Sequence, residues 1–403
     1  MGGTLMLQRI VAGLALAVAA ACAFAASAMA DTVKIGLIIP YSGPFAQAGD
    51  EMDKGLRLYI KEHEKDLPPD LKVELVVRDS TGPNPDVAKR LAQELITRDH
   101  VQLLSGLVES PNAAAIAPLT AEAKVPMVIM NAAGVNIPRL SPYIVRVSFT
   151  LWQISLPMGQ WAAKNGYKKA YVAVSDFIPG HDAEGGFTKG FTDGGGQIVG
   201  TTRVPLSQLD FVPILQRIKD AGPQAVFIFV PAGKYATAVM KAWADLGLKD
   251  AGIQLVTTQD VMLDEELPNM GDIPLGIVST GNYSNAATLP QNKAFLEAWN
   301  RAYGDKAVPD FFSVGGWDGM AAIFDMLKKT GGKFTGDEAM AFFKNWKNPD
   351  SPRGPIMIDP ETRDIVQNIY IRRVEKVDGK PANVEIATIP MVKDPWKELN
   401  PAK

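Results

Sequence analysis

The chain contains few of the side chains that most often carry out catalysis or bind metals. Among its 403 residues there are three histidines and one cysteine. Cys22 falls in an N-terminal segment that we expect to be removed, so the mature protein would have no disulfide, thiolate nucleophile or cysteine-based metal site. His63, His100 and His181 do not form a spacing such as H-E-x-x-H, in which two histidines bind one metal ion. We therefore expect neither a metal nor another cofactor.

Motifs for nucleotide binding and for covalent catalysis are also missing. The chain has no G-x-G-x-x-G after a predicted strand, no G-x-x-x-x-G-K-[ST] and no G-x-S-x-G. The run Gly194–Gly196 follows a predicted helix and precedes a strand, which is the reverse of the order in phosphate-binding loops. No pair of carboxylates can be assigned to acid–base chemistry from the sequence. An enzyme is therefore the weakest of the functions considered.

The chain also lacks a strong excess of charge and, beyond its first thirty residues, a long apolar run. Removing residues 1–30 takes away Arg9 only, which leaves 40 basic and 44 acidic residues and a net charge of −4. No basic surface for nucleic acid is indicated, so we expect no nucleic-acid partner. No later segment offers the roughly 18 uninterrupted apolar residues that a membrane helix needs.

Residues 1–30 have the pattern of an export signal. Arg9 precedes an apolar stretch from Ile10 to about Ala21, and the segment ends in Ala28-Met29-Ala30, an A-x-A cleavage pattern. The apolar stretch is too short to span a membrane comfortably. We predict cleavage after Ala30 and a soluble periplasmic protein. A retained membrane anchor and lipid attachment at Cys22 are the alternatives.

The remaining chain alternates strand and helix patterns. Helical patterns separate short apolar segments, and the alternation restarts from Gln153. Strands are predicted at 35–40, 72–78, 101–105, 125–130, 143–147, 170–175, 197–204, 225–230, 253–257 and 275–280. Because these strands are apolar on both faces, we expect parallel sheets covered by helices on both sides. Two such sets without a flexible linker predict an α/β protein with two similar lobes.

The most informative stretch is VKIGLIIPYSGPFAQAGDEMDKG, residues 33–55. The apolar run Ile35–Pro40 leads into a small-residue loop and then into a helix predicted to open at Gly49–Asp50. A loop between a strand's carboxyl end and a helix is where open α/β sheets bind small ligands. This order of strand, SGP, Gly-Asp and a helix entered with glycine resembles the start of mature type I periplasmic solute-binding proteins. The resemblance is to the branched-chain amino-acid (Leu/Ile/Val-binding) subfamily, and it extends over nearly the whole mature chain.

The resemblance implies a fold and a function. The fold would be two Rossmann-like lobes with parallel-rich sheets, joined by three hinge crossings near 148–151, 280–284 and 353–357. Lobe 1 would be residues 31–149 plus 282–353, and lobe 2 residues 150–281 plus 354–403. The protein would be a monomer that closes on a small ligand and delivers it to the membrane permease of an ABC importer. A ligand-sensing receptor component of the same fold is the alternative.

Two loops of the predicted first lobe supply candidate ligand-binding residues. Phe45 could stack on a ligand and Gln47 could hydrogen-bond it, unless this loop only packs over its own lobe. Ser110 begins a predicted helix, where free backbone N–H groups attract carboxylate oxygens. The resemblance implies that the corresponding serine holds the ligand carboxylate. The alternative is that Ser110 only caps its own helix.

A third loop departs from the family pattern. Where amino-acid binders have a threonine, this chain has Gly134-Val135, so we expect the backbone of Ala133 and Gly134 to contribute instead. A methyl group cannot replace a hydroxyl partner, which argues against an amino-acid ligand.

Two loops of the predicted second lobe complete the candidate site. After strand 170–175 the family has a tyrosine-glycine pair, whereas this chain has Pro179-Gly180, with Phe177 as a possible substitute and His181 as a possible hydrogen-bonding group or solvated residue. Asp260 resembles the family's acidic partner for a ligand ammonium, although it could instead be a surface carboxylate or a helix cap.

The ligand class stays open at this level. A small carboxylate is predicted, either an aliphatic amino acid or an aromatic or other organic acid or amide. Asp260 favours a cationic group on the ligand, whereas Val135 and Pro179 favour loss of the amino-acid pattern. One or two further aromatic walls are expected from Trp152, Tyr235, Tyr283 and Phe311-Phe312.

Overall fold

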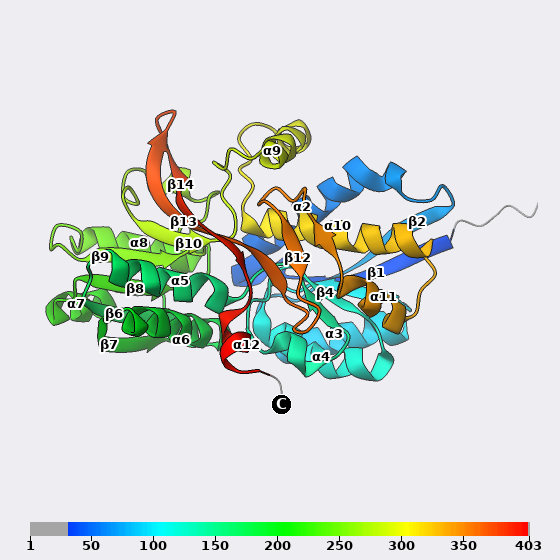
Figure 1. Cartoon of the computed structure of the whole chain (residues 1–403), viewed down its shortest axis with the longest axis horizontal. Coiled ribbons are helices and arrows are strands. Elements are labelled where there is room, and N and C mark those ends of the chain that lie inside the picture. The colour runs from blue at the N-terminus through cyan, green and yellow to red at the C-terminus, as the bar shows by residue number, and fades with distance from the viewer. Residues whose placement is uncertain (1–30, 402–403) are drawn as a thin grey trace, which may run out of the picture.

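The computed structural model describes residues 31–401, which form two α/β lobes side by side (Figure 1). The predicted signal segment, with its cleavage after Ala30, lies outside the described residues. Among residues 31–401, no helix is long and apolar enough to cross a membrane. The predicted class, α/β with two parallel-rich sheets, is confirmed.

Lobe 1 denotes a five-stranded sheet and the helices packed on it. All neighbouring strands are parallel, in the order β2-β1-β3-β4-β5. The strands are β1 (Asp31–Ile39), β2 (Leu71–Asp79), β3 (Leu103–Gly106), β4 (Met127–Ile129) and β5 (Ile144–Arg146). The helices are α2 (Ala46–His63), α3 (Pro85–Thr97), α4 (Ser110–Ala123), α9 (Pro290–Tyr303), α10 (Phe311–Thr330) and α11 (Gly336–Phe343). Short 3-10 turns are η1 (Gly43–Phe45), η2 (Glu64–Asp66) and η3 (Ile137–Leu140).

Lobe 2 denotes a nine-stranded mixed sheet and its helices. Its path is β11-β12-β13-β10-β9-β8-β6-β7, with β14 paired to β13. The parallel strands are β6 (Lys169–Ser175), β7 (Gln197–Val204), β8 (Ala225–Phe229), β9 (Gln254–Thr258) and β10 (Val278–Gly281). The antiparallel strands are β11 (Lys347–Asn348), β12 (Ile356–Ile358), β13 (Ile365–Val377) and β14 (Lys380–Val392). The helices are α5 (Leu151–Lys164), α6 (Ile178–Asp193), α7 (Val212–Ala221), α8 (Lys234–Asp245), η4 (Leu267–Met270) and α12 (Pro395–Leu399).

Burial of β1 on both faces explains its undivided apolar sequence. Ile35, Leu37 and Ile39 belong to the core formed with α2 and α10, whereas Ile38 packs with residues of α3 and α4 on the other face. A parallel sheet covered on both sides needs such strands, because neither face meets water.

Glycines allow the close approach of one helix pair in each lobe. A Cβ on Gly55 of α2 would lie 1.9 Å from the carbonyl oxygen of Ser313 in α10. In lobe 2, a Cβ on Gly190 of α6 would lie 2.1 Å from the carbonyl oxygen of Leu156 in α5. Any larger side chain at either position would force the two helices apart, so these pairs fix how the helices sit on their sheets.

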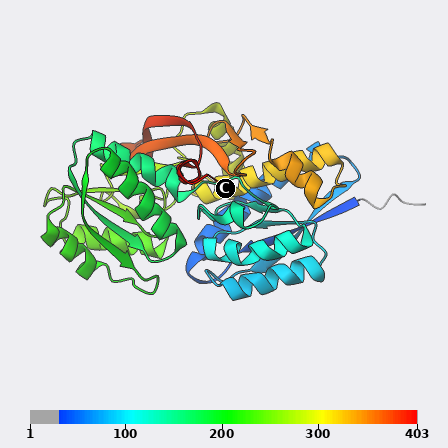
Figure 2. The same cartoon turned by 60° about the horizontal axis from the view of Figure 1, so that its bottom comes forward.

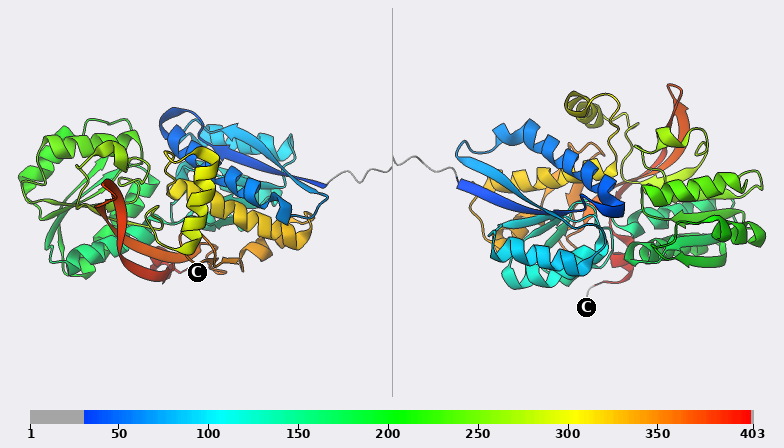
Figure 3. Two further views of the ribbon diagram at one scale, coloured as in Figure 1. Left: turned by 90° about the horizontal axis from the view of Figure 1, so that it is seen from above. Right: turned by 180° about the vertical axis from the view of Figure 1, so that it is seen from behind.

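The lobes are joined through a buried polar network around Arg353. Its Nε lies 2.7 Å from Oδ2 of Asp318 in α10, and its guanidinium donates to the carbonyl oxygens of Val147 and Ser148 and to Gln367 of β13. Figures 2 and 3 show β13 and β14 reaching from lobe 2 along the junction toward lobe 1. Arg353 therefore ties together segments from both sides of the junction. The predicted residue boundaries of the lobes remain a prediction.

Candidate functional site

A cavity lies between the lobes, where loops after the carboxyl ends of parallel strands face one another. Its walls come from the loops that follow β1, β3 and β4 of lobe 1 and β6, β8 and β9 of lobe 2, with additions from α5 and α10. The cavity volume is about 50 Å³, counted as the space open to the centre of a water-sized sphere. A single water needs about 10–15 Å³ counted in the same way, so the cavity has room for a small molecule.

Phenylalanine side chains form much of the cavity wall. The five that line it are Phe45, Phe149, Phe177, Phe229 and Phe312. Phe177 lies in the short loop after β6, and Phe229 ends the adjacent strand β8. Their ring centroids lie 6.1 Å apart and their planes 18° from parallel. Flat, rigid and apolar walls of this kind favour a ligand with an aromatic body.

Ser110 gives the lobe 1 wall a free hydrogen-bond donor. It is 1% exposed and is the first residue of α4, and its Oγ accepts a hydrogen bond from the N–H of Gly134 (3.0 Å). The hydroxyl proton is thus left to donate to a ligand. The cap position of α4 is Glu109 and carries no side-chain cap bond, so Ser110 does not cap its own helix. Hydroxyl and helix N-terminus together suit a carboxylate.

Arg146 fixes the loop that supplies Ala133 and Gly134. Its buried guanidinium donates to the carbonyl oxygens of Ala132 (2.8 Å) and Gly134 (2.7 Å) and pairs with Asp364 (2.7 Å). Burial lowers the pKa of Arg146 to about 10, which leaves it charged at neutral pH. The carbonyl groups therefore turn toward Arg146, and the N–H of Gly134 is held on Ser110.

Asp260 lines the opposite wall, from lobe 2. It is 8% exposed, and its Oδ2 accepts a hydrogen bond from the Thr258 hydroxyl (2.9 Å). Burial raises its pKa from 3.8 to about 6, although the Thr258 bond, its own backbone N–H and the charge of Arg372 act in the other direction. Arg372 forms its ion pair with Asp264 instead (3.7 Å). Among residues 31–401, Asp260 is therefore a buried carboxylate without a direct cationic partner.

Three hydrogen bonds from two residues of lobe 1 reach lobe 2 beside the cavity. Nε2 of Gln47 donates to Glu265 and to Glu266 of lobe 2, each at 2.7 Å. The N–H of Val135 donates to Asp182 of α6 at 3.0 Å. These contacts require the lobes to be together, so the structure is a closed form.

Comparison with known proteins decides the family. The model of the family described as periplasmic binding protein matches residues 32–380, most of the chain. The chain belongs to the periplasmic binding protein family. The predicted resemblance is therefore confirmed, and with it an extracytoplasmic solute-binding role of the ABC-transporter type rather than an enzyme.

Three similar proteins show how far the likeness extends. A solute-binding protein of an ABC transporter from Rhodopseudomonas palustris BisB5, solved with 3,4-dihydroxybenzoic acid, is 49% identical, with a TM-score of 0.87 over 91% of this chain and 99% of that one. Another from R. palustris, solved with 4-hydroxybenzoate, is 45% identical, with a TM-score of 0.87 over 90% and 98%. Leu/Ile/Val-binding protein homolog 6 of Brucella melitensis is 45% identical over 92% of this chain and 95% of its own length.

In this periplasmic binding protein, six of the eight candidate residues predicted from sequence line one cavity. They are Phe45, Gln47, Ser110, Ala133, Phe177 and Asp260. Gly134 lies behind Ser110 and acts through it. His181 does not line the cavity, because its side chain is 41% exposed and its Nε2 lies 2.7 Å from Asp176. Ligand contact by the six remains a prediction.

Sequence reasoning missed several wall residues. Phe229 ends a correctly predicted strand and Phe149 lies within the predicted crossing near 148–151, so their positions were a usable signal. Of the suggested aromatic walls, Phe312 lines the cavity. Glu109 and Asn131 also line it, and one side-chain oxygen of each has no hydrogen-bond partner among the described residues. Burial raises the pKa of Glu109 to about 7.

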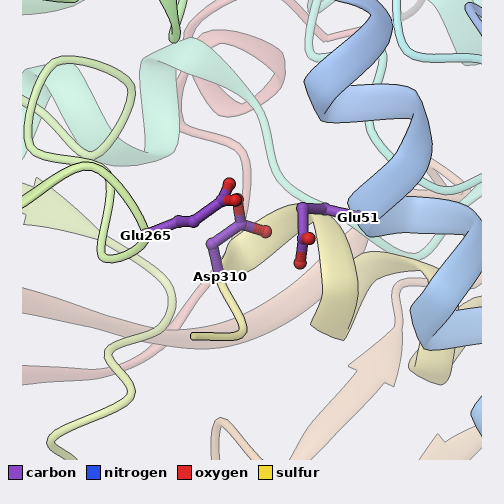
Figure 4. A group of neighbouring side chains, drawn as sticks. All are labelled: Glu51, Glu265 and Asp310. Atoms are coloured by element: carbon purple, nitrogen blue, oxygen red, sulfur yellow. The ribbon is translucent and has the colours of Figure 1, made fainter. Parts of the chain in front are cut away.

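Three carboxyl groups meet near Gln47, at the junction of the lobes (Figure 4). Glu51 of α2, Asp310 before α10 and Glu265 of lobe 2 have oxygens within 4.8 Å of one another, close enough to hold a metal ion. Lys54 already pairs with Glu51 (2.7 Å). Burial and neighbouring carboxylates raise the pKa of Glu265 to about 7 and that of Asp310 well above its usual range. The closed arrangement of the lobes therefore favours the protonated forms of these carboxyl groups.

Proposed function

We propose that this protein captures a small aromatic carboxylic acid outside the cytoplasm and delivers it to the membrane permease of an ABC importer. The observation that carries this proposal is the cavity wall of five phenylalanine side chains beside the free hydroxyl of Ser110. The two Rossmann-like lobes, joined at a hinge, support capture by closure. The two R. palustris relatives solved with hydroxylated benzoic acids support the same ligand class.

In the proposed complex, different groups bind the carboxylate and the ring of the ligand. The ligand carboxylate accepts hydrogen bonds from Ser110 Oγ and from backbone N–H groups at the start of α4, where the helix dipole favours negative charge. The ring lies among Phe45, Phe177 and Phe229. Closure excludes water from both contacts and strengthens them.

A branched-chain amino acid is the second candidate. The name of the Brucella melitensis relative and the buried carboxylate of Asp260, which could pair with an ammonium group, favour it. The replacement of the family's threonine by Gly134-Val135 removes a polar partner for such a ligand. The aromatic walls therefore favour the aromatic acid.

The proposal includes export with cleavage after Ala30 and action as a monomer. The pattern Ala28-Met29-Ala30 after a short apolar stretch supports cleavage there. N-terminal sequencing of the exported protein tests this step, and a lipidated Cys22 would contradict it.

Isothermal titration calorimetry tests the ligand class. The protein is first unfolded, dialysed and refolded, so that a carried-over ligand is removed. We expect benzoate or 4-hydroxybenzoate to bind at one site per chain, and L-leucine to bind far more weakly. Tighter binding of L-leucine than of either aromatic acid would contradict the proposal.

A further inference from the structure

The cavity contains a charge that a simple aromatic acid does not explain. Asp260 lines it as a buried carboxylate, yet the proposed ligand brings a second carboxylate to the opposite wall. Like charges in a water-poor cavity repel, and a buried carboxylate without a hydrogen-bond donor costs free energy. A ligand that offers Asp260 a further hydrogen-bond donor would offset this repulsion.

The protein supplies few donors to Asp260. Its carboxylate accepts a hydrogen bond from the Thr258 hydroxyl and is close to its own backbone N–H, whereas the terminal nitrogens of Arg372 face Tyr283, Ser279 and Asp264. The other lobe 2 residues that line the cavity are apolar, among them Phe177, Phe229 and Leu263. The protein itself thus supplies acceptor capacity at this wall and little to satisfy it.

We propose that Asp260 accepts a hydrogen bond from a hydroxyl group on the ligand ring, so that the protein selects hydroxylated aromatic acids over unsubstituted ones. The inference rests on the proposed function, since it presumes that Ser110 and α4 hold the ligand carboxylate. A phenolic hydroxyl is a neutral donor, and its bond to a carboxylate is a strong charge-assisted one.

The placement of the polar groups fits a ring substituted at opposite ends. Ser110 begins α4 in lobe 1, whereas Asp260 follows β9 in lobe 2, and phenylalanines from both lobes lie in the same wall. Glu109 and Asn131 belong to the Ser110 wall, because Glu109 is its neighbour in sequence and the amide of Asn131 donates to the Val108 carbonyl oxygen. Of the acidic side chains that line the cavity, Asp260 is therefore the one on the wall facing Ser110.

A ligand without the ring hydroxyl should bind with lower affinity. Benzoate would leave the Asp260 carboxylate buried against the ring edge with an unfilled acceptor. Sites built to bond a hydroxyl discriminate strongly against the analogue that lacks it, because the buried group is left unpaired. We expect wild-type protein to bind 4-hydroxybenzoate at least about tenfold more tightly than benzoate.

The test compares both acids on three proteins by calorimetry: wild type, Asp260→Ala and Asp264→Asn. Asp264 is a buried acid of the same loop that does not line the cavity, so Asp264→Asn is the matched control. Asp260→Ala should bind the two acids within about threefold of each other, mainly through loss of 4-hydroxybenzoate affinity. Asp264→Asn should keep the wild-type preference. Thermal melting without ligand checks that each variant is folded.

The outcomes separate the two proposals. Equal wild-type affinity for benzoate and 4-hydroxybenzoate, or an unchanged preference in folded Asp260→Ala, would overturn the role of Asp260 while leaving the proposed function intact. Should Asp260→Ala fail to fold, Asp260→Asn takes its place, and an undiminished preference in that variant also overturns the role. Binding of L-leucine in place of both aromatic acids would overturn the proposed function, and this inference with it.

Discussion

The two walls of the cavity are built in different ways. The lobe 1 wall presents Ser110 at a helix start, with a loop that Arg146 fixes in place. The lobe 2 wall presents stacked rings, Phe177 and Phe229, and the buried carboxylate of Asp260, which accepts from Thr258. Under the proposed function, the first wall would bind any carboxylate, whereas the second would respond to the other groups of the ligand. We therefore expect general affinity and selectivity to depend on different lobes.

Substitution of Ser110 should remove the polar contact of the lobe 1 wall. Of the proposed substitutions, we expect this one to lower ligand affinity most. Ser110→Ala removes a donor to the ligand carboxylate, which costs about 1–3 kcal/mol, so affinity should fall about fivefold to 150-fold for benzoate and 4-hydroxybenzoate alike. Calorimetry with both acids measures it.

Ser105→Ala is the control for this change. Ser105 is also a buried serine of this lobe, and its hydroxyl donates to the Val128 carbonyl oxygen (2.8 Å) without lining the cavity. Both variants should lose about 1 kcal/mol of stability, since Ser110→Ala leaves the N–H of Gly134 without its acceptor. Wild-type affinity in folded Ser110→Ala would remove Ser110 from the site.

Substitution of Phe229 should weaken the lobe 2 wall to a smaller extent. Phe229→Leu keeps an apolar side chain but loses the ring contact, worth about 0.5–1.5 kcal/mol, so affinity for aromatic acids should fall roughly threefold to tenfold. Phe227→Leu on the same strand is the control, because Phe227 stacks on Phe187 in the core and does not line the cavity. Equal affinity losses in the two variants would show that Phe229 acts only through packing.

The acidic junction should add a modest pH dependence to closure, the smallest of the three effects. The pKa of Glu265 rises from 4.5 to about 7 when the lobes are together, so the closed form takes up protons in this window. Closure is thus favoured at low pH and weakens as pH rises toward about 7, beyond which the loss is complete. Ligand affinity should fall severalfold between pH 6 and pH 8.

Glu265→Gln should reduce this pH dependence, measured by calorimetry at both pH values. Glu266→Gln is the matched control, because Glu266 shares the Gln47 contact but lies outside the cluster of three carboxyl groups. The same slope in wild type and Glu265→Gln would show that other groups, such as Asp182 or Asp260, set the dependence.

Local sequence was sufficient wherever a site residue lies at the end of a parallel strand. Phe45, Ser110, Phe177 and Asp260 all follow predicted strands, and the carboxyl ends of parallel strands meet at one edge of a sheet. Their convergence on one cavity follows from that geometry. The prediction for His181 is wrong for a local reason. Helix α6 begins at Ile178, so His181 already lies within the helix, and its side chain pairs with Asp176 outside the cavity.

The sequence by itself determined the α/β alternation, the family and the strand ends that carry the site, because each depends on periodicity and on short-range turn and helix-start signals. Only the tertiary structure decided which side chains meet across the lobes. The side chain of Gln47 donates hydrogen bonds to Glu265 and Glu266. The carboxyl groups of Glu51, Glu265 and Asp310, which belong to three separate segments, lie close together. Such contacts depend on how the two lobes close on each other. No local pattern in the chain encodes the distance between residues of different lobes.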